Sequence, residues 1–275
     1  MNDFNAFRRR LERELAAHPV VAANPFTEWF AQGKATEADL RDLVEQFSVF
    51  SNHFLVVQAK RLVNANTEAG ERCARDILVN ECGVAMDAQA GTAEGRRFSS
   101  ANAHIEWLRS LGRALGLDPR KLGRWELGRH ETRGFLETLD RTYGSRDPIV
   151  GAGASFAVET WASWGIGKGP GQEKRNFWRQ LIDGFEAFEK GRGPGHEPLP
   201  LGFFKFHFAV EGGHGASVWA ELERDFAEPG FDQDAFVKAG KEALDGVLLF
   251  WTGLDRQRRR VAEPALDLDL AQIGF

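Results

Sequence analysis

Apolar residues recur three and four positions apart along most of the chain, and this spacing restricts the fold more than any other feature. The stretch after residue 36 is the clearest case, because its apolar side chains follow helical spacing: Leu40, Leu43, Phe47, Phe50, Phe54 and Val57. Such spacing places side chains on one face of an α-helix. We find no convincing series of alternating strands. The sequence therefore predicts an all-α helix bundle.

Residues that favour the start or the end of a helix divide the chain into separate expected helices. Thr36 and Asp39 can form a capping box at the start of the long helix. Residues 83–100, GVAMDAQAGTAEGRRFSS, are rich in glycine and small residues, which predicts a loop insertion. The other expected helices cover roughly 3–17, 68–82, 102–117, 125–143, 148–164, 177–188 and 232–258. We expect residues 1–275 to form a single domain, with a core at about 30–260, a short N-terminal helical extension and a C-terminal tail.

Composition excludes several classes of function. The chain has 275 residues and a formal net charge of -5, without the basic stripe that nucleic-acid binding would require. No apolar run is long enough to span a bilayer or resembles a signal peptide, so we expect no membrane partner. The two cysteines, Cys73 and Cys82, match no disulfide framework, which favours a cytoplasmic location. The oligomeric state is not readable, although a homodimer is common at this size.

The motif His207-x3-Glu211-x2-His214 is the sharpest candidate for chemistry. Positions i, i+4 and i+7 of an α-helix fall within an arc of about 60°, so the three side chains share a face. The two histidines lie about 10 Å apart along the axis, which suits two ions better than one. Imidazole and carboxylate ligands suit iron, manganese or zinc. The alternative is an exposed polar face formed by chance, but the flanking sequences FFKFHFAV and ASVWAEL are apolar.

Three glycines lie within or beside this motif: Gly212, Gly213 and Gly215. Each costs about 1 kcal/mol relative to alanine in a helix. We hypothesise that residues 207–216 are locally disordered without metal and become ordered when metal binds.

A site for two metals needs further ligands from other core helices. Glu81, His104 and Glu159 qualify, because each lies beside apolar residues within or at the end of an expected helix. Taken singly, each can equally be a polar residue satisfied by other contacts.

The ordered series Glu81, His104 followed by IEWLRSLGRALGLDP, Glu159 within GAGASFAVETW, and the His207 motif resembles the haem-oxygenase-like di-iron oxidases and oxygenases. The resemblance covers roughly residues 30–250. It implies a haem-oxygenase-like bundle in which six residues hold two iron ions (Fe2+), with manganese as the alternative metal: Glu81, His104, Glu159, His207, Glu211 and His214. The sequence departs from this family in two ways. Glu211 stands where Asp is usual, and the spacing from Glu81 to His104 is long, so Asp87 is an alternative ligand.

The resemblance also implies an O2-dependent oxidase or oxygenase that acts on a small organic substrate. Family members cleave carbon–carbon bonds in fatty or amino acids, or oxygenate nitrogen, and an external electron donor is compatible with this chemistry. One subgroup consumes its own tyrosine, but Tyr143 is the single tyrosine here, which argues against that role.

The substrate pocket is less defined. Phe47, Phe50 and Phe54 could line it together with His53, although a Phe stripe at helical spacing is more often core packing. His53 and Lys205 could meet a substrate carboxylate, and surface positions are the alternative for both.

Three other classes remain open at this point: a metal-free, thiaminase-like hydrolase that uses Cys or Glu, a haem-binding helical protein, and a non-catalytic metal-binding or interaction protein.

Overall fold

A computed structural model describes residues 3–85, 96–193 and 195–262, which form α-helices and two short 3-10 helices. In chain order these are α1 (Phe4–Glu14), α2 (Pro19–Ala22), α3 (Pro25–Phe30), α4 (Glu37–Asn64), α5 (Glu68–Glu81), η1 (Ser100–Asn102), α6 (His104–Ala114), η2 (Trp125–Leu127), α7 (His130–Arg141), α8 (Pro148–Ala162), α9 (Pro170–Glu173), α10 (Phe177–Gly191), α11 (Gly202–Phe226) and α12 (Gln233–Ala262). Within the described ranges the one strand-like pairing is an isolated bridge between Val84 and Phe98. The all-α prediction is confirmed.

Two of the helices, α4 and α8, begin where the sequence signals place them. The Asp39 carboxylate accepts a hydrogen bond from the Thr36 backbone N–H at 2.8 Å, and the Thr36 hydroxyl accepts one from the Asp39 N–H at 3.3 Å. This is the predicted capping box. Asp147 caps α8, whose first residue is Pro148.

The helix expected at 125–143 is not continuous, which corrects the sequence prediction. It divides into η2 and α7, and Gln46 of α4 occupies the break. The Gln46 side chain donates to the Leu127 carbonyl at 3.0 Å and accepts from the Arg129 N–H at 2.9 Å. A side chain from another helix thus satisfies backbone groups at the break that a continuous helix would pair internally.

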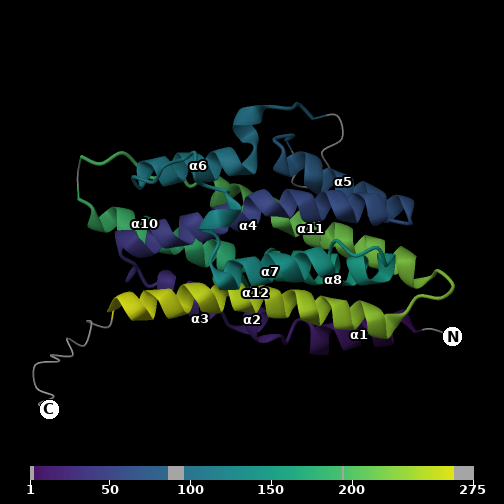
Figure 1. Cartoon of the computed structure of the whole chain (residues 1–275). Coiled ribbons are helices and arrows are strands. Elements are labelled where there is room, and N and C mark those ends of the chain that lie inside the picture. The colour runs from purple at the N-terminus through teal and green to yellow at the C-terminus, as the bar shows by residue number, and fades with distance from the viewer. Residues whose placement is uncertain (1–2, 86–95, 194, 263–275) are drawn as a thin grey trace, which may run out of the picture.

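The long helices lie side by side along the length of the molecule (Figure 1). In that view α12 spans one side of the bundle, and it packs chiefly against α8 and α7. Gly153 of α8 permits the closest approach, since a Cβ at this position would clash with the backbone carbonyl of Phe236 on α12. The backbones of α8 and α12 therefore touch.

Aromatic rings dominate the core. Phe47 of α4 is fully buried, and its ring lies 5.6 to 6.2 Å from rings on three other helices, counted centroid to centroid: Trp178, Phe203, Phe204, Phe250 and Trp251. Contacts of this kind join α4, α10, α11 and α12 into one apolar interior. No helix in the described part of the chain combines the length and apolarity needed to cross a membrane.

Candidate metal centre

The three residues of the His207 motif lie on one buried face of α11, as the spacing predicts. Their exposed fractions are 6% for His207, 4% for Glu211 and 6% for His214. The accidental, solvent-exposed polar face is therefore excluded. Buried imidazole and carboxylate groups need partners, and the neighbouring helices supply them.

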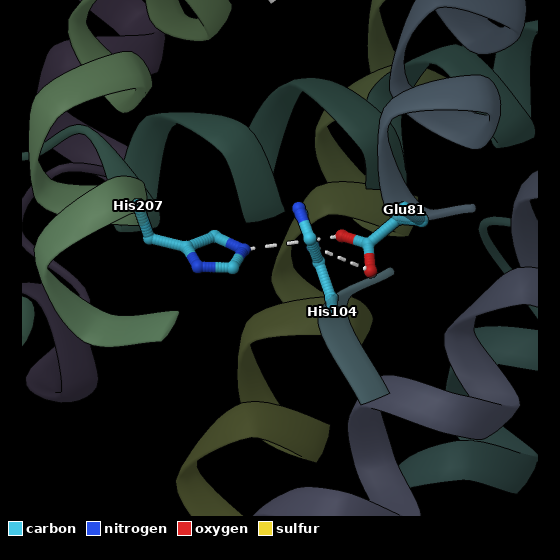
Figure 2. Close-up of side chains that lie close together, drawn as sticks. All are labelled: Glu81, His104 and His207. Carbon is cyan, nitrogen blue, oxygen red and sulfur yellow. Dashed lines mark ion pairs between the residues drawn. The ribbon is translucent and has the colours of Figure 1, made fainter. Parts of the chain in front are cut away.

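The first group of partners, which we call the first triad, consists of Glu81, His104 and His207. Glu81 is the last residue of α5, and His104 is the first residue of α6. His104 Nδ1 lies 2.8 Å from Glu81 Oε2, and His207 Nε2 lies 3.9 Å from Glu81 Oε1. Figure 2 shows the Glu81 carboxylate facing both imidazoles, with His207 reaching in from α11 on the opposite side.

The long spacing between Glu81 and His104 is explained by the loop that joins them. Its two ends meet at the bridge between Val84 and Phe98, and the Ser99 N–H donates to the Gly83 carbonyl at 3.0 Å. This pairing brings the end of α5 close to the start of α6, so the two candidate ligands come together despite their distance in sequence. Asp87, the alternative ligand, lies outside the described residues.

The second triad consists of Glu159 on α8 with Glu211 and His214 on α11. His214 Nδ1 lies 3.3 Å from Glu211 Oε2 and 3.7 Å from Glu159 Oε2. In each triad one candidate ligand atom per residue lies within 4.8 Å of the others. The six predicted ligands are therefore grouped as two sets of three, and α11 contributes to both.

Several polar atoms at the two triads have no hydrogen-bond partner, although they are buried. These are His104 Nδ1 and Nε2, Glu211 Oε2 and His214 Nε2. The short His104–Glu81 approach is not aligned as a hydrogen bond. Unpartnered buried nitrogen and oxygen atoms are costly, and a cation coordinated by them would remove that cost. The donor set, three imidazoles and three carboxylates, fits iron or manganese.

Other contacts orient the imidazole of His207. Its Nδ1 lies 2.8 Å from the Phe203 carbonyl, a contact that requires the proton on Nδ1 and directs the Nε2 lone pair toward Glu81. The ring also stacks on Trp178, with centroids 4.6 Å apart. This is the arrangement expected for a metal-binding histidine.

Charge repulsion is concentrated at the second triad. Burial and the nearby Glu211 carboxylate raise the pKa of Glu159 to about 8. Burial opposes the charged form of His214, but Glu211 and Glu159 outweigh it and raise its pKa to about 9. At Glu81 burial is outweighed by His104 and His207, which lower its pKa to about 2. Two carboxylates this close favour a bound cation.

The sequence reasoning missed a residue that contacts the second triad. Tyr143, fully buried, donates to Glu159 Oε1 at 3.3 Å. Its phenolic oxygen accepts from Gln58 at 2.6 Å and from Ser155 at 3.2 Å. The signal available in the sequence was that this chain of 22 phenylalanines keeps one tyrosine.

A cavity of about 40 Å³, which we call the metal cavity, adjoins both triads. Phe47, Phe50 and Phe54 of α4 line it. His53 does not line it and instead faces a separate cavity beside Trp125, which corrects its placement in the substrate pocket. α4 turns His53 about 100° away from Phe54, the next residue.

Lys205 does not line the metal cavity either. It lies on the surface, where its Nζ is 3.1 Å from Glu186 Oε1. Neither of the two side chains proposed to meet a substrate carboxylate therefore reaches the candidate ligands.

Comparison with solved structures identifies the fold of this chain. No family model matches the sequence, and no curated protein shows significant similarity to it. Six solved chains match the structure. One is a domain of unknown function with a heme oxygenase-like fold from Shewanella denitrificans, with a TM-score of 0.62 and 13% identity over 97% of this chain and 98% of that chain. The present chain has a heme oxygenase-like fold. Both triads lie inside this heme oxygenase-like bundle, so the predicted resemblance is confirmed for the fold.

Proposed function

We propose that this protein is a non-haem di-iron enzyme, an O2-dependent oxidase or oxygenase of a small organic substrate. The observation that supports it is the pairing of two buried triads of histidine and carboxylate ligands, both of which include residues of α11. Two adjacent triads suit two ions better than one, and mixed imidazole and carboxylate ligands suit redox-active metals.

In this proposal the first triad holds one ion through Glu81, His104 and His207, and the second holds the other through Glu159, Glu211 and His214. Three carboxylates balance three of the four charges of two Fe(II) ions. When bound, the iron pair supplies the electrons and the binding positions for O2 that oxidative chemistry requires. An external donor would restore the reduced state, and manganese is the alternative metal.

The walls of the metal cavity suggest which part of a substrate reacts. Apart from the candidate ligands, its lining is apolar except for Ser51, and no lysine or arginine is among the lining residues of the described chain. A charged carboxylate has no counterion there. We therefore expect an alkyl carbon or a neutral amine of a fatty-acid-like or amino-acid-like molecule to face the metals, and C–C cleavage or N-oxygenation to follow.

The cysteine-dependent form of the metal-free hydrolase is less well supported, because neither cysteine is placed as a nucleophile. Cys73 does not line the metal cavity, and burial together with Glu221 raises the pKa of its thiol. Cys82 is exposed outside the cavity. A reactive cysteine requires a lowered pKa.

Anaerobic reconstitution tests the proposal. The full chain, freed of metal, is titrated with Fe(II), bound iron is counted per chain, and O2 is then added while absorption is followed. We expect two irons per chain, an O2-dependent absorption change, and loss of iron in His207→Ala and Glu211→Ala. His130→Ala, a change at an exposed histidine, is the matched control.

Fewer than two irons in the unmodified chain, or full binding by His207→Ala and Glu211→Ala, would overturn the di-iron assignment. Two bound irons without O2 consumption would instead indicate metal storage. A Soret band after incubation with haem, together with no Fe(II) binding, would indicate a haem protein. Fatty acids and amino acids are then screened for acceleration of the absorption change.

A further inference from the structure

A second cavity, which we call the α1 cavity, lies between α1, α8 and α11 and has a volume of about 240 Å³. Gly212, Gly215 and Trp219 of α11 line it. At 100° per residue, these positions are rotated by roughly 80 to 140° from His207. Among the described residues none lines both this cavity and the metal cavity. Thus α11, which carries three candidate metal ligands on one side, borders the α1 cavity on another side.

The walls of the α1 cavity are largely apolar and aromatic. The apolar and aromatic lining residues include Leu11 of α1, Leu15 directly after it, Phe156 of α8, Trp164 and Trp219. An apolar cavity of about 150 Å³ is enough to bind benzene. The α1 cavity can therefore accommodate one ring with a short chain.

Two cations flank the aromatic walls. The Arg8 guanidinium lies 4.9 Å from the Trp219 ring centroid, and Lys168 Nζ lies 4.6 Å from that of Trp164. Arg8 also pairs with Glu12 at 3.5 Å, whereas Lys168 forms no ion pair with the described residues. With Arg8, Lys168 and Glu12 all lining the cavity, its rim carries a net positive charge.

Apolar walls and a cationic rim together describe a site for a molecule with an apolar body and an anionic end.

We propose that the α1 cavity is a second binding site, and that its ligand is a small amphipathic carboxylate. The ring or short chain lies against Trp164 and Trp219, and the carboxylate lies at the rim near Lys168 and Arg8. An ammonium ligand is disfavoured by the same two cations. This site is independent of the proposed oxidase activity, because it shares no lining residue with the metal cavity.

Three probes that share one apolar body test the charge requirement: 3-phenylpropionate, 3-phenylpropan-1-ol and 3-phenylpropylamine. Each is titrated into the full chain with Zn(II) added, a diamagnetic ion that suits imidazole and carboxylate ligands and keeps residues 207–216 ordered, and amide and indole signals are followed by NMR. We expect 3-phenylpropionate to bind most tightly and the amine least, with shifts at Gly212, Gly215 and the indoles of Trp164 and Trp219. Equal binding of all three probes, or shifts confined to Trp161 and Trp178 in the metal cavity, would overturn the proposal.

Substitutions at Gly212 test the location. A Cβ there meets only Ile166 Cγ2, at 3.4 Å, so Gly212→Ala leaves most of the cavity open, whereas Gly212→Leu fills it. Both changes favour helix, so the fold is expected to persist, and circular dichroism checks this. We expect Gly212→Ala to bind 3-phenylpropionate and Gly212→Leu to lose binding. Unchanged binding by a folded Gly212→Leu protein would refute the assigned cavity.

Lys168→Gln tests the rim without altering the interior. For a solvent-exposed charge pair we expect about a threefold loss of affinity for 3-phenylpropionate and none for the alcohol. Lys238→Gln, at an exposed lysine on α12, is the matched control. An equal change for acid and alcohol in Lys168→Gln would contradict the proposed position of the carboxylate.

Discussion

The phenolic hydroxyl of Tyr143 donates to the Glu159 carboxylate at 3.3 Å, so the one tyrosine of this chain touches the second triad. Groups that hydrogen-bond to metal ligands set the orientation of those ligands, and their loss typically weakens metal binding by about 10- to 100-fold.

Tyr143→Phe removes this hydrogen bond and keeps the ring. We expect metal affinity to fall by about tenfold at one of the two sites, because Glu159 loses its orienting partner. Anaerobic titration against a competing chelator measures it. Ser155→Ala is the control, since it removes another hydrogen bond to the same phenol and leaves the one to Glu159. Equal affinities in Tyr143→Phe and the unmodified chain would show that the phenol does not position Glu159.

Position 211 is Glu in this chain, whereas Asp is usual in the family that it resembles. Two substitutions distinguish the effect of side-chain length from the effect of side-chain charge at this position. Glu211→Asp shortens the side chain by about 1.5 Å but keeps the carboxylate, so we expect two metals per chain. Glu211→Gln keeps the length and removes the charge, so we expect one metal to be lost. Elemental analysis after dialysis measures both, and retention of two metals by Glu211→Gln would argue that Glu211 is not a ligand.

We predict that alanine substitutions at Gly215 and at Gly212 change the free energy of unfolding in opposite directions. A Cβ at Gly215 would lie 2.5 Å from Ser163 Oγ, so α11 and α8 must separate, and we expect a loss of about 1 to 3 kcal/mol. The Cβ of Gly212→Ala meets no such contact, and the better helix propensity predicts a gain of about 1 kcal/mol. Urea unfolding compares the two. Ser163→Gly should restore stability to Gly215→Ala, and failure of this rescue would exclude the Ser163 contact as the cause.

The hypothesis of metal-dependent ordering also concerns these glycines. The structure describes α11 as continuous from Gly202 to Phe226, and the contact of Gly215 with Ser163 provides a packing reason for one glycine. We still expect residues 207–216 to exchange their amide hydrogens faster without metal, because ligation stabilises a weak helical segment. Hydrogen-exchange mass spectrometry with and without Fe(II) measures this, with α12 as the internal reference. Equal protection in both states would refute the hypothesis.

Much of the fold and the shared face of three candidate ligands could be predicted from the sequence, because both depend on local patterns. Helical spacing places His207, Glu211 and His214 on one face whatever surrounds them. The resemblance supplied Glu81, His104 and Glu159, which composition alone could not distinguish from other buried polar residues. Whether the six residues hold metal remains a prediction.

The features that sequence could not predict depend on tertiary contacts. The break between η2 and α7 exists because Gln46, from a distant helix, pairs with backbone groups there. Tyr143 fits a helical pattern as well as phenylalanine would, so its contact with Glu159 appears only in three dimensions. His53 follows Phe50 along α4, but the packing of the neighbouring helices decides which cavity each side chain reaches.

The contact between Gly153 and the Phe236 backbone has a consequence for how this fold can vary among homologous chains. Gly153 precedes Glu159 by six residues, which places the two about 120° apart around α8. Any larger residue at position 153 would push α8 away from α12 and shift the Glu159 carboxylate relative to α11. Because every residue at position 236 presents the same backbone, we expect homologues that keep a carboxylate at position 159 either to keep glycine at position 153 or to change the length of the acidic side chain at 211.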